Sequence, residues 1–87
     1  MYAIRWLPNA SKALSHLDKS VAKRIWNRVA WLAEHLDEIV PQRLTGEFAR
    51  LYKQREGDYR ILYEIIPADN AIVIHAIGHR REVYRKR

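Results

Sequence analysis

The sequence contains no cysteine, and it has only three glycines and three prolines among 87 residues. The absence of cysteine excludes disulfides, thiol nucleophiles and cysteine-ligated zinc. With 48% hydrophobic residues, this composition is typical of a globular chain rather than a disordered one. No apolar run approaches the ~18 residues of a membrane-spanning helix, and residues 1–8 lack the apolar stretch of a secretory signal. We therefore expect a single domain over residues 1–87, cytoplasmic and without contact with a membrane.

Negative charge is also scarce, because 16 Lys and Arg residues stand against 10 Asp and Glu residues, a formal net charge of +6. The excess is largest in residues 79–87, which hold five basic side chains and one acidic side chain. A basic surface of this kind favours a polyanionic partner, either nucleic acid or an acidic protein. The alternative is a solvated basic tail on an ordinary small domain.

The first half of the chain has one strand pattern followed by two helix patterns. Residues 2–7 are rich in β-forming side chains and end at a proline, which cannot continue a strand. A short helix capped by Asn9 or Ser11 is expected next, and a break follows at residues 18–20. A longer helix has apolar residues three and four apart and ends before Pro41. The two helices are therefore predicted to form a hairpin with one apolar face.

Three β-rich runs follow, at residues 50–56, 59–66 and 71–78. They are separated by residues 57–58 and 67–70, which have the composition of turns. Two consecutive hairpins make an antiparallel meander, which gives the helical hairpin a flat surface to cover. The predicted fold class is α+β: an antiparallel sheet with an N-terminal helical hairpin packed on one face, in the order β-α-α-β-β-β, with room for a short C-terminal helix.

The turn at residues 57–58 sets the pairing of the first hairpin. If the loop has two residues, Arg55 lies opposite Arg60 and Lys53 lies opposite Leu62. Side chains alternate between the two faces of a strand, so the Tyr and Ile side chains of the second strand cover the face that suits the helices. The three cations then gather on the other face, where like charges destabilise the sheet unless an anion binds. A phosphate meets that requirement.

Other kinds of catalytic site have little support in the sequence. The three glycines are too scattered for a phosphate-binding loop, and the four histidines lack the spacing of metal ligands. The serines lie on or beside the expected helices rather than in a nucleophile elbow. We expect neither a bound metal nor an organic cofactor.

Tyr84 has two interpretations. It lies among Arg80, Arg81, Arg85 and Lys86, where a ring beside guanidinium groups is placed to stack on a base or to orient a phosphate. The alternative is that Tyr84 packs the C-terminal end onto the sheet. The three tryptophans are more typical of a core or a partner groove than of base stacking.

Four segments of the chain carry a resemblance to a known family. They are residues 44–46 (LTG), 52–55 (YKQR), 57–63 (GDYRILY) and 77–84 (IGHRREVY). In this order and at this chain length they resemble the RelE-like branch of the RelE/ParE toxin superfamily. The similarity covers nearly the whole chain, including the order of the expected elements.

The resemblance implies a type II toxin that acts as a metal-independent endoribonuclease, an mRNA interferase. Such a toxin enters the ribosomal A site, cleaves the mRNA there by attack of a ribose 2′-OH, and so inhibits translation. The products are a 2′,3′-cyclic phosphate and a 5′-OH. The implied partners are the 70S ribosome with its A-site mRNA and a RelB-like antitoxin in a hetero-oligomer. Operator DNA is reached only through the antitoxin.

The resemblance also implies the catalytic residues. Arg55 and Arg60 are expected to hold the nonbridging phosphate oxygens. Lys53 is the candidate for activating the 2′-OH, directly or through Tyr84. Arg80 is expected to stabilise or protonate the leaving 5′-oxygen. This chain is two residues shorter between Arg80 and Tyr84 than some members, a difference that bears on the placement of the tyrosine. Further RNA contacts are expected from His79, which is also an alternative acid or base, and from Arg81, Arg85 and Lys86.

Two other functions stay open at this point. A ParE-like inhibitor of DNA gyrase shares the fold, binds a protein target and needs no nuclease site. The feature that distinguishes the two functions is the set of catalytic candidates, which a gyrase inhibitor does not need: Lys53, Arg55, Arg60, Arg80 and Tyr84. A nonenzymatic RNA-binding module would use the same basic face. It would bind RNA with strong salt dependence but generate no new RNA ends.

Overall fold

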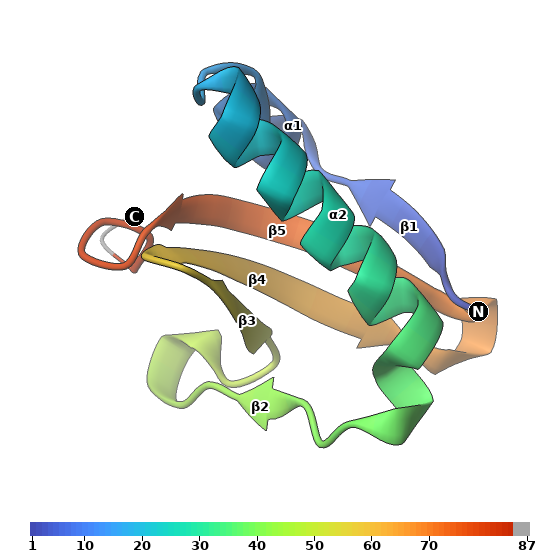
Figure 1. Ribbon diagram of the computed structural model, residues 1–87. Helices are drawn as coiled ribbons and strands as arrows, with labels where there is room; N and C mark the ends of the chain where they lie inside the picture. Colours follow the sequence, from blue (N-terminus) through green and yellow to red (C-terminus); the bar gives the residue numbers. More distant parts are fainter. Residues whose placement is uncertain (85–87) are drawn as a thin grey trace.

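A curved five-stranded sheet covered by two helices makes up residues 1–84, the part of the chain that the computed structural model describes (Figure 1). The three central strands form the predicted antiparallel meander. None of the helices in this part of the chain is long and apolar enough to cross a membrane. The elements are β1 (Ala3–Trp6), α1 (Pro8–Ser15), α2 (Lys19–His35), β2 (Gln42–Arg43), β3 (Tyr52–Glu56), β4 (Tyr59–Ile66) and β5 (Ala71–His79).

The strand order is β1-β5-β4-β3-β2, and its two edge strands extend the predicted meander. β1 pairs with β5 in parallel, with Ala3 opposite Ala71 and Trp6 opposite Ile74. The sheet is thus mixed rather than antiparallel throughout. The helical hairpin and the first two strands of the meander lie between β1 and β5 in the chain, so these two strands are not joined by a tight turn and can run in the same direction. β2 was not predicted; its two residues pair antiparallel with β3.

The first helix begins one residue earlier than its expected cap. Pro8 is the first residue of α1, where its missing N–H costs no hydrogen bond. Leu7 occupies the capping position, and its carbonyl accepts a hydrogen bond from the Ser11 amide (3.0 Å). The prediction that Asn9 or Ser11 caps this helix is therefore wrong, since both lie inside it. α2 begins at Lys19, so the break expected at residues 18–20 ends at Asp18. This helix buries apolar residues three and four apart, as the spacing predicts.

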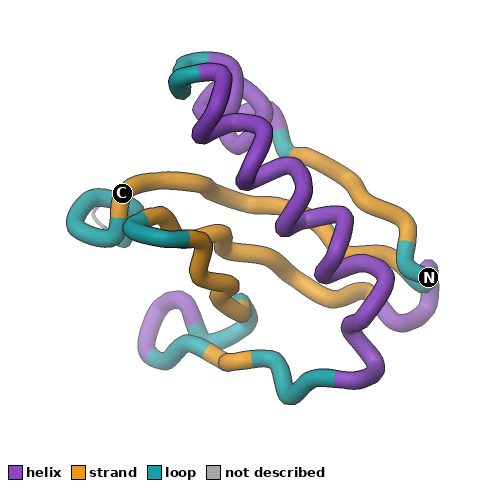
Figure 2. Tube along the Cα trace, in the orientation of Figure 1, coloured by secondary structure: helices purple, strands orange, loops and turns teal. Residues whose placement is uncertain are grey.

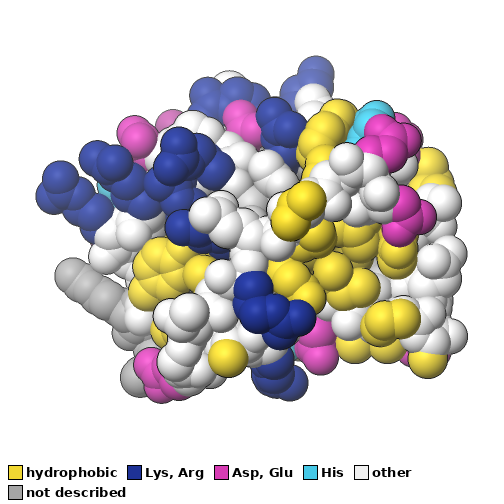
Figure 3. All heavy atoms as spheres, turned by 90° about the horizontal axis from the view of Figure 1, so that it is seen from below, with side chains coloured by type: hydrophobic (Ala, Val, Ile, Leu, Met, Phe, Trp, Pro, Cys, Tyr) yellow, Lys and Arg dark blue, Asp and Glu magenta, His cyan; other side chains and the backbone are white. Residues whose placement is uncertain are grey.

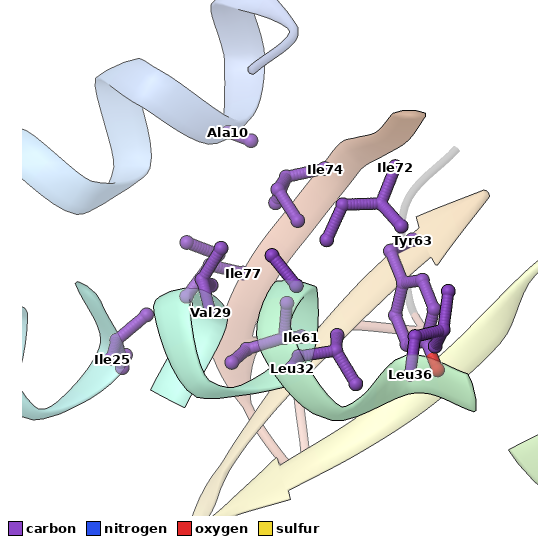
Figure 4. Packing of buried hydrophobic residues seen from close by; sticks show 11 residues of the cluster. Ala10, Ile25, Val29, Leu32, Leu36, Ile61, Tyr63, Ile72, Ile74 and Ile77 are labelled. Carbon is purple, nitrogen blue, oxygen red and sulfur yellow. The ribbon is translucent and has the colours of Figure 1, made fainter. Parts of the chain in front are cut away.

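In Figure 2, α2 lies across one face of the sheet, and the close view in Figure 4 shows the buried side chains of the main core between them. Ile25, Val29 and Leu32 project from α2 toward apolar side chains of β4 and β5. Tyr63 is fully buried there, and its hydroxyl has no hydrogen-bond partner within residues 1–84. Burial raises the pKa of Tyr63 to about 12, because the phenolate would lose its hydration.

A second, smaller group of apolar side chains, the outer cluster, covers part of the opposite face. Val83 and Tyr84 join this cluster because the chain folds back after β5: the Val83 amide donates to the His79 carbonyl (3.0 Å). Gly78 permits this fold, since a Cβ there would lie 3.3 Å from the Val83 Cβ. Residues 80–84 form turns, so the described part of the chain contains no C-terminal helix. The outer cluster consists of Leu51, Leu62 and Val83, with Leu44, Phe48, Ala76 and Tyr84 packed against them.

Candidate functional site

The hairpin of β3 and β4 has the predicted register. Its loop at residues 57–58 begins with a glycine at φ +59°, as a type II′ turn requires. Arg55 lies opposite Arg60, and Lys53 lies opposite Leu62. Because Leu62 belongs to the outer cluster, the alternation of side chains places the three cations on the face that α2 does not cover.

Arg60 is a buried charged residue, with only 8% of its surface exposed. Its Nη1 donates to the carbonyls of Gly57 (3.1 Å) and Tyr59 (3.0 Å). No carboxylate of residues 1–84 lies within 4.0 Å of its charged nitrogens. A buried cation without a counter-charge is costly, and a bound anion would supply the missing charge.

Arg80 is tied to this hairpin through its backbone. Its amide donates to the carbonyl of Asp58 in the β3–β4 turn at 2.8 Å, so the end of β5 is anchored beside Arg55 and Arg60. The Arg80 side chain is exposed and ion-paired to no described carboxylate. We call Lys53, Arg55, Arg60 and Arg80 the cationic cluster.

The acidic side chains of this region are engaged elsewhere. Glu56 lies on the α2 side of β3, where Arg28 (3.1 Å) and Arg24 (3.7 Å) bind its carboxylate. None of the carboxylates in residues 1–84 pairs with the cationic cluster. In Figure 3, Lys and Arg side chains gather toward the end of the molecule where the C-terminus lies. The cationic cluster therefore has no carboxylate partner among the described residues.

The residues predicted for further RNA contacts fall into three groups. Arg81 is exposed beside Arg80. His79 pairs with Tyr59 across the sheet and meets its ring edge-on at 5.9 Å, so strand alternation places it on the α2 side, away from Arg60. The structure therefore separates His79 from the cationic cluster by the thickness of the sheet. Arg85 and Lys86 lie outside the described residues.

Tyr84 packs into the outer cluster, with its ring edge-on to Phe48 at 6.0 Å between ring centres. This is the packing that the sequence left as an alternative. The ring is still half-buried rather than enclosed, and no hydrogen bond joins its hydroxyl to another described residue. Tyr84 thus lies on the same face of the sheet as Lys53.

One pair on this face escaped the sequence analysis. Glu64 accepts a hydrogen bond from His75 Nε2 at 2.9 Å, and Arg50 approaches the same carboxylate at 3.9 Å. The register of β4 and β5 shifts between Leu62 and Tyr63, which brings His75 onto the face of Glu64. Nothing in the spacing of the two residues marks this bulge. Within residues 1–84, no group of three or more His, Asp or Glu side chains is arranged to hold a metal ion.

The sequence matches a known family over nearly its whole length. The family is described as ParE toxin of type II toxin-antitoxin system, parDE, and its model matches residues 4–84. The chain therefore belongs to this family of toxin–antitoxin toxins, within the RelE/ParE superfamily. Among curated proteins, none matches the chain in sequence at a significant level.

The same fold occurs in solved RelE structures. The RelBE2 toxin–antitoxin complex of Mycobacterium tuberculosis contains a chain that is 26% identical, with a TM-score of 0.81 over 91% of this chain and 98% of that one. The RelE–RelB complex of the archaeon Pyrococcus horikoshii gives 25% identity and a TM-score of 0.68 over 94% and 98%. The isolated RelE toxin of Escherichia coli, at 20% identity, gives a TM-score of 0.76 over 91% and 84%. The architecture described above is thus RelE-like.

Proposed function

We propose that this toxin is a ribosome-dependent endoribonuclease that cleaves mRNA in the A site. The observation that supports the proposal most directly is the pairing of Arg55 with buried Arg60, neither of which has a carboxylate partner among residues 1–84. An arrangement that is unfavourable in the free protein becomes favourable around a phosphate. Arg80, anchored at the adjacent turn, adds a third guanidinium.

The proposed reaction uses the substrate's own hydroxyl. The ribose 2′-oxygen attacks phosphorus, and its proton passes to the Lys53 amine, directly or through Tyr84. The bond from phosphorus to the 5′-oxygen breaks, and the leaving 5′-oxygen takes up a proton from water. The products are a 2′,3′-cyclic phosphate and a 5′-OH. Arg55 and Arg60 hold the nonbridging oxygens, where negative charge grows in the transition state. Arg80 stabilises the leaving oxygen as its charge develops.

The proposal includes an antitoxin partner. The solved neighbours include toxin–antitoxin complexes, among them RelE–RelB of Pyrococcus horikoshii and the YoeB–YefM heterotetramer of Staphylococcus aureus. A net charge of +6 favours an acidic partner. We propose a RelB-like antitoxin in a hetero-oligomer that contacts operator DNA, whereas this chain contacts DNA only through it. The site of action, with the 70S ribosome, is the cytoplasm.

The test is brief expression of the chain followed by primer extension on an abundant transcript. New 5′ ends within translated codons are expected; they should vanish for Arg80→Ala and when translation is blocked. Arg5→Ala is the matched control, because Arg5 is an exposed arginine on β1 that pairs with Asp69 at 3.1 Å. Cleavage by Arg80→Ala at the rate of the unchanged protein, with its fold intact by circular dichroism, would refute the assignment.

Inhibition of DNA gyrase is the second candidate, and the match to the ParE toxin family model favours it. The same expression experiment separates the two functions. Growth arrest with intact mRNA and with DNA breaks would support the gyrase inhibitor. Growth arrest with neither kind of break would support RNA binding without catalysis.

A further inference from the structure

The outward side of α2 presents a large apolar residue to solvent. Trp26 is 53% exposed, and its ring stacks on Trp6 of β1 at 5.5 Å between ring centres. Beside the two rings lies a hollow of about 330 Å³, whose other walls are Ile4, Val29 and Ala30. In Figure 1, β1 and β3 lie on opposite sides of α2, so this hollow is on the side away from β3. An exposed tryptophan beside an apolar hollow is typical of a surface that contacts another protein.

The charged residues of α2 on this side oppose the helix dipole. Lys19 is the first residue of the helix, the first turn contains no acidic residue, and Glu34 is the last residue but one. Lys23 adds another exposed cation near the start. A helix is partially positive at its N-terminus and partially negative at its C-terminus, so both charges stand at the unfavourable end. Among residues 1–84, no ion pair compensates Lys19, Lys23 or Glu34.

Four residues of α2 form a continuous band, which we call the α2 stripe: Lys23, Trp26, Ala30 and Glu34. At about 100° per residue, they fall within about 80° of one another around the helix axis. The stripe is positive at one end, apolar in the middle and negative at the other end. The midpoint between Lys23 and Glu34 lies within about 1 Å of the midpoint between Trp26 and Ala30 along the axis. The stripe is therefore complementary to itself when it is turned end for end.

A second copy of the chain, related by a two-fold axis through this midpoint, matches the α2 stripe. Antiparallel pairing of the helices places Lys23 opposite the partner's Glu34, and Trp26 opposite the partner's Ala30. The small alanine side chain and the hollow beside it leave room for the indole. Each charge then lies near the end of the partner helix whose dipole attracts it. A two-fold interface uses the same patch on both copies, as this arrangement requires.

We propose that two copies of this chain associate through the α2 stripe as an antiparallel pair of α2 helices. The cationic cluster lies on the face of the sheet that α2 does not cover, so it is kept out of the interface and the proposed RNA site stays open. A uniformly acidic partner fits this surface less well, because Glu34 at one end of the stripe would repel it. Contact through one helix and a hollow buries less than about 1,200 Å² in total, so we expect association at micromolar rather than nanomolar concentrations.

The test measures self-association of the full chain by sedimentation at concentrations up to about 1 mM. An ionic strength of about 0.15 M screens the repulsion between two chains that each carry a net charge of +6. A dimer is expected, and the indole N–H resonance of Trp26 should shift with concentration in ¹⁵N-labelled protein. Lys23→Glu and Glu34→Lys should each weaken association at least tenfold, because the two-fold axis turns every reversal into two repelling pairs.

Combining the two reversals separates an interface from an effect within one chain. The double variant of Lys23→Glu and Glu34→Lys keeps the net charge at +6 and restores opposite charges at both pairs, so association should return. The two residues are about 17 Å apart along the helix, too far to contact each other in one chain. An equimolar mixture of the two single variants should associate for the same reason. Glu47→Lys, an exposed reversal next to Phe48 of the outer cluster, is the matched control and should leave association unchanged.

A chain that sediments as a monomer at every concentration would overturn the proposal. A dimer that the single reversals do not weaken, or that the double variant does not restore, would also overturn it, because another surface would then join the copies. If the chain stays monomeric and the Trp26 resonance shifts only when a RelB-like antitoxin is added, the α2 stripe binds a different protein and the proposal is wrong. The substituted residues lie outside the proposed catalytic residues, so these outcomes are independent of whether the chain cleaves mRNA.

Discussion

Arg55 and Arg60 lie directly opposite each other across the ladder between β3 and β4, on the face of the sheet that α2 does not cover. Like charges at this spacing destabilise a sheet. Repulsion between the two guanidinium groups therefore lowers the stability of the free protein. A bound phosphate would attract both groups and turn this cost into a favourable interaction.

Replacing Arg55 with Gln should separate stability from activity. The free energy of unfolding is expected to rise by about 0.2–1 kcal/mol, because the repulsion with Arg60 disappears. Cleavage should fall by about 10²–10³-fold, since one donor to the phosphate oxygens is lost. Urea unfolding and primer extension measure the two effects. Arg5→Gln, which breaks an exposed ion pair with Asp69, should leave cleavage unchanged and lower stability by at most about 1 kcal/mol.

Inorganic phosphate should stabilise the protein through the cationic cluster. At a concentration of ten times its dissociation constant, the expected gain is about 1.4 kcal/mol, seen as a rise in Tm. Phosphate also stabilises proteins by exclusion from their surface, so the comparison is with Arg60→Gln at the same ionic strength. An equal rise in Tm for both proteins would show that phosphate does not bind at Arg60.

Gly78→Val should displace the turn that follows β5. The first added carbon already lies 3.3 Å from the Val83 Cβ, and a branched side chain needs more room than the turn leaves. Overpacking of this kind costs about 1–3 kcal/mol. Because the same segment anchors Arg80 at Asp58, cleavage should fall along with stability.

Gly46→Ala is the matched control for that prediction. Gly46 has φ +64°, and an added Cβ meets no atom within 4 Å. The cost is then only the left-handed backbone conformation, about 1–2 kcal/mol, without a change in cleavage per folded molecule. Full activity of Gly78→Val at the same fraction folded would contradict the role assigned to the turn.

Tyr63→Phe should change the stability of the protein at high pH. The folded protein holds the phenolic proton up to a pKa of about 12, against 10.0 for an ordinary tyrosine, because the ring is buried. The unfolded chain releases this proton first, so this contribution is complete below pH 10 and is lost between about pH 10 and 12. Urea unfolding across this range should show a steeper fall for the unchanged protein than for Tyr63→Phe.

Near neutral pH, Tyr63→Phe should be neutral or stabilising. The hydroxyl has no hydrogen-bond partner within residues 1–84, so its removal leaves no broken bond and relieves the cost of burying a polar group. A loss of more than about 1 kcal/mol at pH 7 would show that the hydroxyl makes an interaction in solution.

The parts of the fold that follow from neighbouring residues were predictable. The helical stripe of Ile25, Val29 and Leu32 and the three strands of the meander depend on patterns within about 20 residues, where spacing alone decides which side chains share a face. The prediction of the α1 cap was wrong for a local reason as well. Proline is favoured at the first helical position, and this preference outweighed the polar capping residues that follow it.

Other features depend on contacts between distant parts of the chain. Ala3 lies opposite Ala71 in a parallel pair, and no local pattern in either segment specifies the direction of its partner. The bulge that joins His75 to Glu64 shifts the register of two strands whose composition gives no sign of it. His79 and Arg80 are neighbours in the sequence, yet strand alternation and the turn after β5 place them in different surroundings.

The sequence by itself determined the pairing of Arg55 with Arg60, because a two-residue turn and the two-residue period of a strand leave only one register. Tertiary structure decided that Arg60 is enclosed, that Tyr84 packs on Phe48, and that Arg80 is anchored beside the turn. The last two outcomes depend on the turn that follows Gly78. Burial is a property of everything that packs around a residue, so it cannot be obtained from the residue's own segment.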